Sequence, residues 1–258
     1  MGAGGVGVVV GGKIKKSLIV EISKLKRKYF VMEEHEVINY LNTTIRNLII
    51  DDIIDVVKFQ SSRRKGRNEG FFDVPRQVFC IVDFLGYLLI PPRANKGHDT
   101  SYRAIKFIET CFPERYKNIA TLVYQQWRHD TVHTLLPKKY IVKKGNVEIV
   151  LNWLSSRSFS KESLDIHMMP MYQKENRNII TIVSNVNQLA EDLLISFDVF
   201  IKKIEHDFDL KKECIRRFNE LIDFHVPKPE CKDIIIKIWQ NPRGILDGKR
   251  VSEIFEDE

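Results

Sequence analysis

Residues 128–133 combine an arginine with two histidines, within the stretch YQQWRHDTVHTLLPKKY. Arg128 and His133 follow the spacing R-x4-H, and His129 comes directly after the arginine. An imidazole titrates near neutral pH, so it can take or give the proton at the 2′-hydroxyl or the leaving oxygen of RNA. A guanidinium is always charged and can hold the phosphate between them. The segment therefore has the groups needed to cleave an RNA phosphodiester without a metal ion.

The spacing alone does not define a site, because Arg93 and His98 form a second R-x4-H pair. That pair follows two prolines and is predicted to lie in a loop, whereas Arg128 and His133 fall in a predicted helix. On a regular helix, residues five apart point about 140° away from each other. A shared phosphate therefore requires a distorted helix, a long reach by Arg128 or a second subunit.

Two other interpretations of the segment stay open. His129 and His133 are four residues apart and share a helix face, so they form a possible zinc pair that Asp130 or a remote carboxylate would complete. No distant group of ligands supports that pair, and no bound metal is predicted. In the structural alternative, His133 is a hydrogen-bonded, partly buried side chain, and Arg128 and Asp130 form surface ion pairs.

Apolar residues at three- to four-residue spacing predict a mainly α-helical protein. The predicted helices cover residues 14–30, 33–59, 71–90, 100–111, 113–136, 179–204 and 210–224. The helix from Pro113 carries the Arg-His segment, and it places His133 on the same stripe as Ile119, Leu122 and Val123. Residues 140–142 and 147–151 are predicted to form a small β-hairpin around a Gly-Asn turn, and residues 166–172 to add a strand.

The composition fits a folded chain with an anionic partner. Its 258 residues are 43% hydrophobic, with a formal charge of +7, which favours RNA or DNA. Residues 61–70, SSRRKGRNEG, are predicted to form a basic loop. The cysteines are far apart, which predicts no disulfide framework and favours a cytoplasmic location. They are Cys80, Cys111, Cys214 and Cys231.

The domain prediction follows from the ends of the chain. Residues 1–12, MGAGGVGVVVGG, are predicted to be a flexible Gly-rich leader, since they lack the basic residues of a signal peptide and are too short to cross a membrane. Residues 13–258 are predicted to form a single α-helical domain with a C-terminal extension. No membrane role is predicted.

Around Arg128, His129 and His133 the sequence resembles the HEPN superfamily, whose signature is R-x4-6-H with a polar residue after the arginine. The similar region, residues 71–205, includes FFDVPRQVFCIVDFLGYLL, FIETCFPERYKNIATLVYQQWRHDTVHTLLPK and VNQLAEDLLISFDVF. The resemblance implies a HEPN-like helical bundle with a small β-hairpin insertion. It also implies a homodimer that brings two Arg-His motifs to one cleft.

In active members of the family, this arrangement is a metal-independent endoribonuclease without a cofactor. The resemblance makes His133 the acid or base, Arg128 the phosphate holder and His129 the neighbour that orients them. A toxin or defence role would add an antitoxin or another regulatory protein as partner. The alternative is a non-catalytic nucleotide-binding or protein-interaction module, which is the role of many members.

Overall fold

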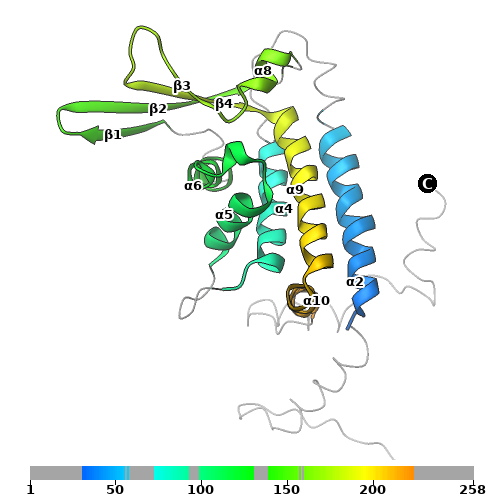
Figure 1. Cartoon of the computed structure of the whole chain (residues 1–258). Helices are drawn as coiled ribbons and strands as arrows, with labels where there is room; N and C mark the ends of the chain where they lie inside the picture. Colours follow the sequence, from blue (N-terminus) through cyan, green and yellow to red (C-terminus); the bar gives the residue numbers. More distant parts are fainter. Residues whose placement is uncertain are drawn as a thin grey trace, which may run out of the picture. The chain divides into compact units, whose positions relative to one another are not determined.

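The computed structural model describes residues 31–55, 57, 73–92, 99–130, 139–156, 158 and 160–223 (Figure 1). Residues 31–221 form one compact unit, and the single domain over residues 13–258 stays a prediction. Several predicted features lie outside the described residues. They are the leader, the first helix, the basic loop, the second R-x4-H pair and His133.

Most of the described residues are helical, as predicted. The structure confirms four of the predicted helices over their described residues. They are α2 (Glu34–Tyr40) with its π-helical continuations η1 (Leu41–Ile45) and η2 (Leu48–Asp55), α4 (Asp73–Leu89), α5 (Thr100–Cys111) and α10 (Phe208–Ile222). The end of α4 is closed by the buried Arg217, which donates from Nη1 to the carbonyls of Tyr87 and Leu88 at 3.2 Å. Three α10 residues, Cys214, Arg217 and Phe218, are buried.

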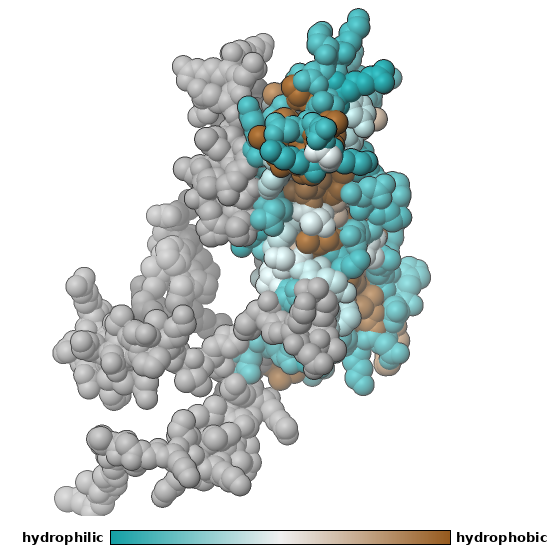
Figure 2. Space-filling model, turned by 90° about the vertical axis from the view of Figure 1, so that its left-hand side faces the viewer, coloured by the Kyte–Doolittle hydropathy of each residue, from teal (hydrophilic) through white to brown (hydrophobic). Residues whose placement is uncertain are grey.

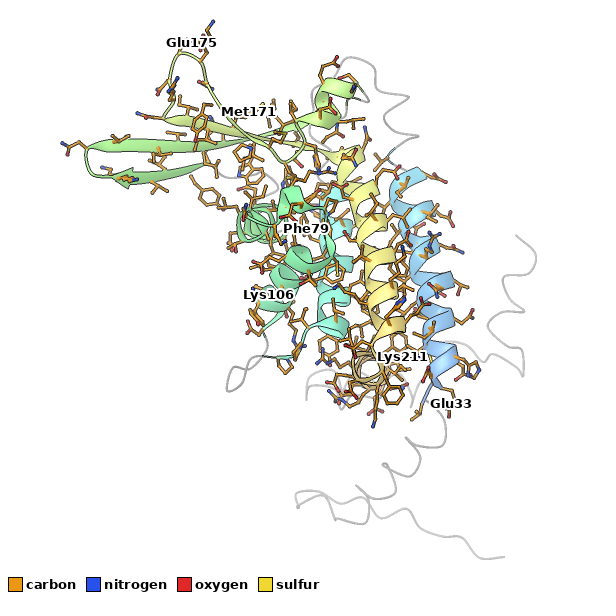
Figure 3. All side chains as sticks on the ribbon, viewed as in Figure 1. Glu33, Phe79, Lys106, Met171, Glu175 and Lys211 are labelled. Atoms are coloured by element: carbon orange, nitrogen blue, oxygen red, sulfur yellow. The ribbon has the colours of Figure 1, made fainter. Side chains whose placement is uncertain are left out.

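Helix α4 packs against α5 and against the long helix α9 (Val186–His206) (Figure 1). Phe79 lies among the helices, whereas Lys106 and Glu175 lie at the surface (Figure 3). At Gly86, a Cβ would be 3.0 Å from the backbone of Arg103, so this glycine allows α4 and α5 to approach closely. None of the described helices is long and apolar enough to cross a membrane.

The β element is larger than the predicted hairpin. Four strands, β1 (Tyr140–Lys144), β2 (Val147–Ser156), β3 (Pro170–Tyr172) and β4 (Ile179–Asn185), form a sheet in the order β1-β2-β4-β3. Strands β1 and β2 pair antiparallel around Gly145, as predicted, and its φ of 63° suits a glycine. Strands β2 and β4 are parallel, and the short helix α8 (Lys161–Asp165) lies in the connection between them.

The prediction of helix from Ile179 is wrong for seven residues, because residues 179–185 form β4 and α9 begins at Val186. A short apolar run does not distinguish a buried strand from a helix. The boundary is set by Asn185, whose side chain accepts hydrogen bonds from the backbone N–H groups of Asn187 and Gln188 and so caps α9.

The predicted helix from Pro113 is also wrong in its first part. Pro113 is extended, with ψ of 152°, and is followed by the 3₁₀ turn η3 (Glu114–Tyr116). Helix proper begins only at α6 (Ala120–Tyr124), which passes into the π-helical turn η4 (Gln125–Asp130). Leu122 is 38% exposed, so it does not share a buried stripe with Val123.

Strands β1 and β2 extend beyond the helices (Figure 1). As a result Ile141, Val142 and Val147 are exposed although they are apolar. Figure 2 shows the molecule from the left-hand side of Figure 1, where hydrophobic groups interrupt the hydrophilic surface.

Candidate functional site

Arg128 of the predicted site lies in η4 and is bound to Asp83 of α4. Its Nε donates to Oδ2 of Asp83 at 2.7 Å. The hydroxyl of Tyr124, at the end of α6, donates to Oδ1 of the same carboxylate at 2.8 Å. We call Asp83, Tyr124 and Arg128 the Asp83 cluster. Both carboxylate oxygens are thus occupied by donors from the segment that carries the Arg-His motif.

The Asp83 cluster is partly open to solvent. The side chain of Arg128 is 31% exposed and that of Asp83 is 15% exposed. The hydrogen bond that Arg128 donates to Asp83 raises the pKa of Arg128, so its positive charge is secure. Burial, and then the charge of Asp83, raise the pKa of Tyr124, which keeps this phenol protonated as a donor. The cluster therefore holds a permanent cation in a defined orientation at the surface.

The turn that carries Arg128 is not a regular α-helix. In the π-helical turn η4, backbone hydrogen bonds join residues five apart, so each turn is wider than in an α-helix. Such turns occur frequently at functional sites. The distortion starts three residues before Arg128, so the regular rotation of about 100° per residue does not apply over Gln125–Asp130.

The structure describes one of the three predicted site residues completely. His133 lies outside the described residues, as do the side chains of His129 and Asp130. The possible zinc pair therefore also lies outside them. In the described part of the chain, no group of three or more His, Cys, Asp or Glu side chains is arranged to hold a metal ion.

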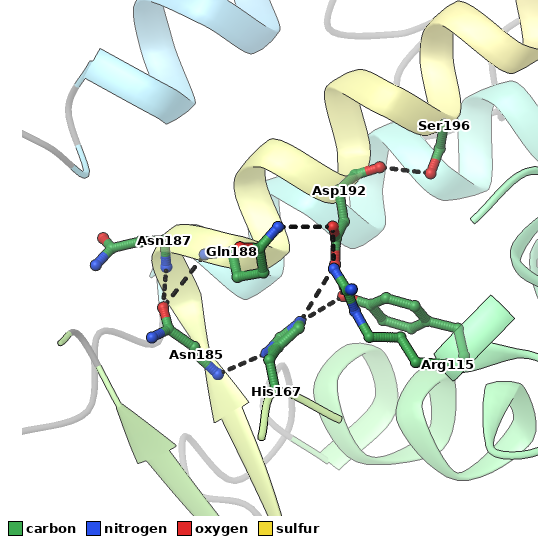
Figure 4. Close-up of polar contacts among 8 residues, drawn as sticks. Arg115, His167, Asn185, Asn187, Gln188, Asp192 and Ser196 are labelled. Carbon is green, nitrogen blue, oxygen red and sulfur yellow. Dashed lines mark hydrogen bonds and ion pairs between the residues drawn. The ribbon is translucent and has the colours of Figure 1, made fainter. Parts of the chain in front are cut away.

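A second group of charged and polar residues surrounds Asp192 of α9, which is buried together with His167 and Tyr116, whereas Arg115 reaches the surface (Figure 4). Arg115 donates to both oxygens of Asp192, at 2.6 Å to Oδ2, and Tyr116 donates to Oδ2 at 2.7 Å. Gln188 donates to Oδ1 at 2.9 Å. Burial alone would raise the pKa of Asp192, but its contacts with His167, Arg115, Gln188 and Tyr116 lower it, so the carboxylate is ionised.

His167 completes this group, which we call the Asp192 cluster. Its Nδ1 accepts from the backbone N–H of Asn185 at 2.8 Å, so the proton of the neutral ring lies on Nε2. Nε2 then donates to the hydroxyl of Tyr116 at 2.7 Å, and that hydroxyl donates to Asp192. Burial lowers the pKa of His167, which favours the neutral ring.

The Asp192 cluster connects the sheet to the helices. His167 forms a β-bridge with Val183 of β4, whereas Tyr116 and Asp192 belong to η3 and α9. The side chains of His167 and Asp192 are both 0% exposed and have hydrogen-bonding partners inside the protein. These groups are therefore placed to fix the fold, since a substrate could reach neither of them.

Neither carboxylate was singled out from the sequence. Asp83 is 45 residues from Arg128, and Asp192 is 77 residues from Arg115, so neither pair produces a local motif. The sequence did contain one indication that His167 is buried. It lies between Ile166 and Met168 in a segment predicted as a strand. A histidine inside an apolar strand is buried or bound more often than a histidine in a loop.

No protein-family model matches the chain, and no curated protein or solved structure matches it either.

Proposed function

We propose that Arg128 is the phosphate-holding group of an RNA-cleaving, HEPN-like site, with His133 as the acid or base and His129 as the neighbour that orients them. The observation that carries this proposal is the Asp83 cluster. Its guanidinium is fixed by a carboxylate at 2.7 Å and is nevertheless 31% exposed. A positioned, solvent-reachable cation beside two histidines in sequence is the arrangement that a phosphodiester requires.

In the proposed reaction, His133 takes the proton of a 2′-hydroxyl while the 2′-oxygen attacks the phosphorus. Arg128 holds the non-bridging oxygens and stabilises the charge that develops on them. The bond from phosphorus to the 5′-oxygen breaks, the leaving oxygen takes a proton from solvent, and His133 returns its own proton to solvent. The products are a 2′,3′-cyclic phosphate and a 5′-hydroxyl, and no metal or cofactor takes part.

The wide turn of η4 supports the proposal in a second way. On a regular helix, Arg128 and His133 would need a second subunit or a distortion to meet one phosphate. The π-helical turn Gln125–Asp130 departs from a regular helix at Arg128, whereas His133 lies outside the described residues. We keep the homodimer as part of the proposal, with the two Arg-His motifs in one cleft.

The test is cleavage of a mixed-sequence RNA in the presence of EDTA, with analysis of the ends. We expect wild-type protein to leave 2′,3′-cyclic phosphates, and Arg128→Ala and His133→Ala to lose at least about 100-fold of the rate, as expected for loss of a charge-stabilising donor or of the acid-base group. Arg46→Ala is the matched control, because Arg46 is 38% exposed and pairs with Asp198. Intact RNA after incubation with wild-type protein would reject catalysis.

The second candidate function is a module that binds nucleotide or RNA without cutting it. The same observation favours it, since a fixed and exposed guanidinium binds phosphate with or without an acid-base group. A binding screen with nucleotides and short RNA separates the two: binding that needs Arg128, together with intact RNA, identifies the module. Equal binding by wild type and Arg128→Ala would leave Arg128 without a ligand role.

A further inference from the structure

We infer that Asp83 and Tyr124 are positioning residues for Arg128, and that they direct its terminal Nη atoms toward an RNA phosphate. This inference rests on the proposed function and extends it to two residues outside the Arg-His motif. Asp83 does not touch the substrate in this account. It acts through Arg128, and Tyr124 acts through Asp83.

The carboxylate of Asp83 holds the guanidinium of Arg128 at one nitrogen. Asp83 contacts Arg128 at Nε, at 2.7 Å, and does not use the outer end of the guanidinium for this contact. A guanidinium binds phosphate through a fork of two N–H groups. With Nε held by Asp83, a phosphate approaches the fork that the two terminal nitrogens form.

The carboxylate of Asp83 is itself held in place by Tyr124. Its Oδ1 accepts from Tyr124, whose side chain is 5% exposed and whose ring packs edge-on against Phe79 with 6.2 Å between ring centroids. Phe79 and Asp83 both belong to α4, one turn apart. The packing of Tyr124 on α4 therefore fixes the carboxylate, and the carboxylate fixes the guanidinium.

The ion pair of Asp83 and Arg128 adds little to the stability of the fold, because one partner is 31% exposed. Helix α4 already packs against η4, and the rings of Phe79 and Tyr124 join α4 to α6. Orientation is the larger effect of the pair, because a long side chain that is fixed in advance loses less entropy when it binds.

The test is the affinity for a 2′-O-methylated oligoribonucleotide, which binds as RNA does but cannot be cleaved. The variants are Asp83→Asn, Tyr124→Phe, Arg128→Ala and the double variant with Asp83→Asn and Arg128→Ala. We expect Asp83→Asn to weaken binding about tenfold and Tyr124→Phe about threefold, in the range of coupling between neighbouring residues. In the Arg128→Ala background, Asp83→Asn should weaken binding no further.

The direction in which Asp83→Asn changes the affinity for RNA distinguishes a positioning role from a purely electrostatic one. Removal of a negative charge beside an RNA site should by itself strengthen binding to phosphates. Weaker binding by Asp83→Asn would therefore support positioning. Unchanged or tighter binding by Asp83→Asn would overturn the inference and leave the role of Arg128 intact. A tenfold loss of affinity when Asp83→Asn is added to Arg128→Ala would also overturn it, because it would show general damage to the protein. Failure of wild-type protein to bind the oligoribonucleotide would overturn the proposed function together with the inference.

Asp198→Asn is the matched control, because it also removes a carboxylate that binds an arginine, Arg46, at the surface. We expect this control to bind the oligoribonucleotide as tightly as wild type or slightly more tightly. Asp83→Glu provides a second readout. A carboxylate that is one methylene longer should restore part of the affinity that Asp83→Asn loses, which loss of helix packing would not explain.

Discussion

The Asp83 and Asp192 clusters use the same residue types in two different environments. In each, one aspartate accepts hydrogen bonds from an arginine and a tyrosine. Asp192 is 0% exposed and also has Gln188 and His167 as neighbours, whereas Asp83 is 15% exposed. The comparison shows that residue types alone do not define a site. Full burial and a complete set of hydrogen bonds make Asp192 and His167 structural, whereas Asp83 is partly open to solvent and its arginine is a candidate for ligand binding. The two arginines themselves are similarly exposed, Arg115 at 33% and Arg128 at 31%.

The largest expected difference is in stability. Asp192→Asn should lower the free energy of unfolding by about 3 kcal/mol, the lower end of the range for a broken buried ion pair, because Arg115 stays 33% exposed. Asp83→Asn should cost about 1 kcal/mol or less. Denaturant unfolding of both variants, with Asp198→Asn as the exposed control, measures the difference. Equal losses for Asp83→Asn and Asp192→Asn would contradict the contrast between the two clusters.

The two tyrosines give a smaller version of the same comparison. Tyr116→Phe removes a hydroxyl that is bonded to both His167 and Asp192, so we expect a loss of about 2 kcal/mol, since buried partners stay unsatisfied. Tyr124→Phe removes one bond to a partly exposed carboxylate and should cost about 1 kcal/mol. Thermal unfolding at neutral pH measures both. A larger loss for Tyr124→Phe would reverse the assignment of structural and ligand-binding roles.

The smallest expected effect is a pH dependence that belongs to the Asp192 cluster. Burial lowers the pKa of His167 in the folded protein, so the unfolded chain takes up a proton first as the pH falls below about 6.5. The stability that depends on neutral His167 is therefore complete above that pH and decreases below it. Asp192, whose pKa is also lowered, contributes in the same direction only in more acidic solution.

Between about pH 6.5 and pH 5, where histidine titrates, the free energy of unfolding should depend less on pH in His167→Gln than in wild type. His206, which is exposed at the end of α9, provides the matched control. His206→Gln should keep the wild-type slope. A slope that His167→Gln leaves unchanged would mean that other groups cause the acid sensitivity.

The elements that depend on local patterns were predictable from the sequence. Apolar spacing located α4 and α5, and the Gly-Asn turn located the hairpin of β1 and β2. The apolar run at Ile179 was assigned to the wrong type of element, because its partner strand β2 is about 30 residues away in sequence and stabilises it as a strand. The break after Pro113 was missed because Tyr116 is anchored by long-range contacts.

The candidate site was predictable only in part. Arg128 was found because its chemistry is visible within six residues, but its partner Asp83 belongs to another helix. The π-helical turn at Gln125 to Asp130 had no sequence signal that we recognised. Single-sequence patterns describe neighbours along one element, whereas both clusters depend on which helix faces become adjacent after packing.

The central claim is that the guanidinium of Arg128 meets an RNA phosphate while Asp83 holds it. The most direct measurement is the NMR signal of the Arg128 Nε–H, assigned by its absence in Arg128→Lys, during titration with the 2′-O-methylated oligoribonucleotide. We predict that this signal shifts in proportion to RNA bound and keeps its slow exchange through the bond to Asp83. A signal that stays in place while RNA saturates the protein would show that the phosphate binds elsewhere, and it would contradict the account.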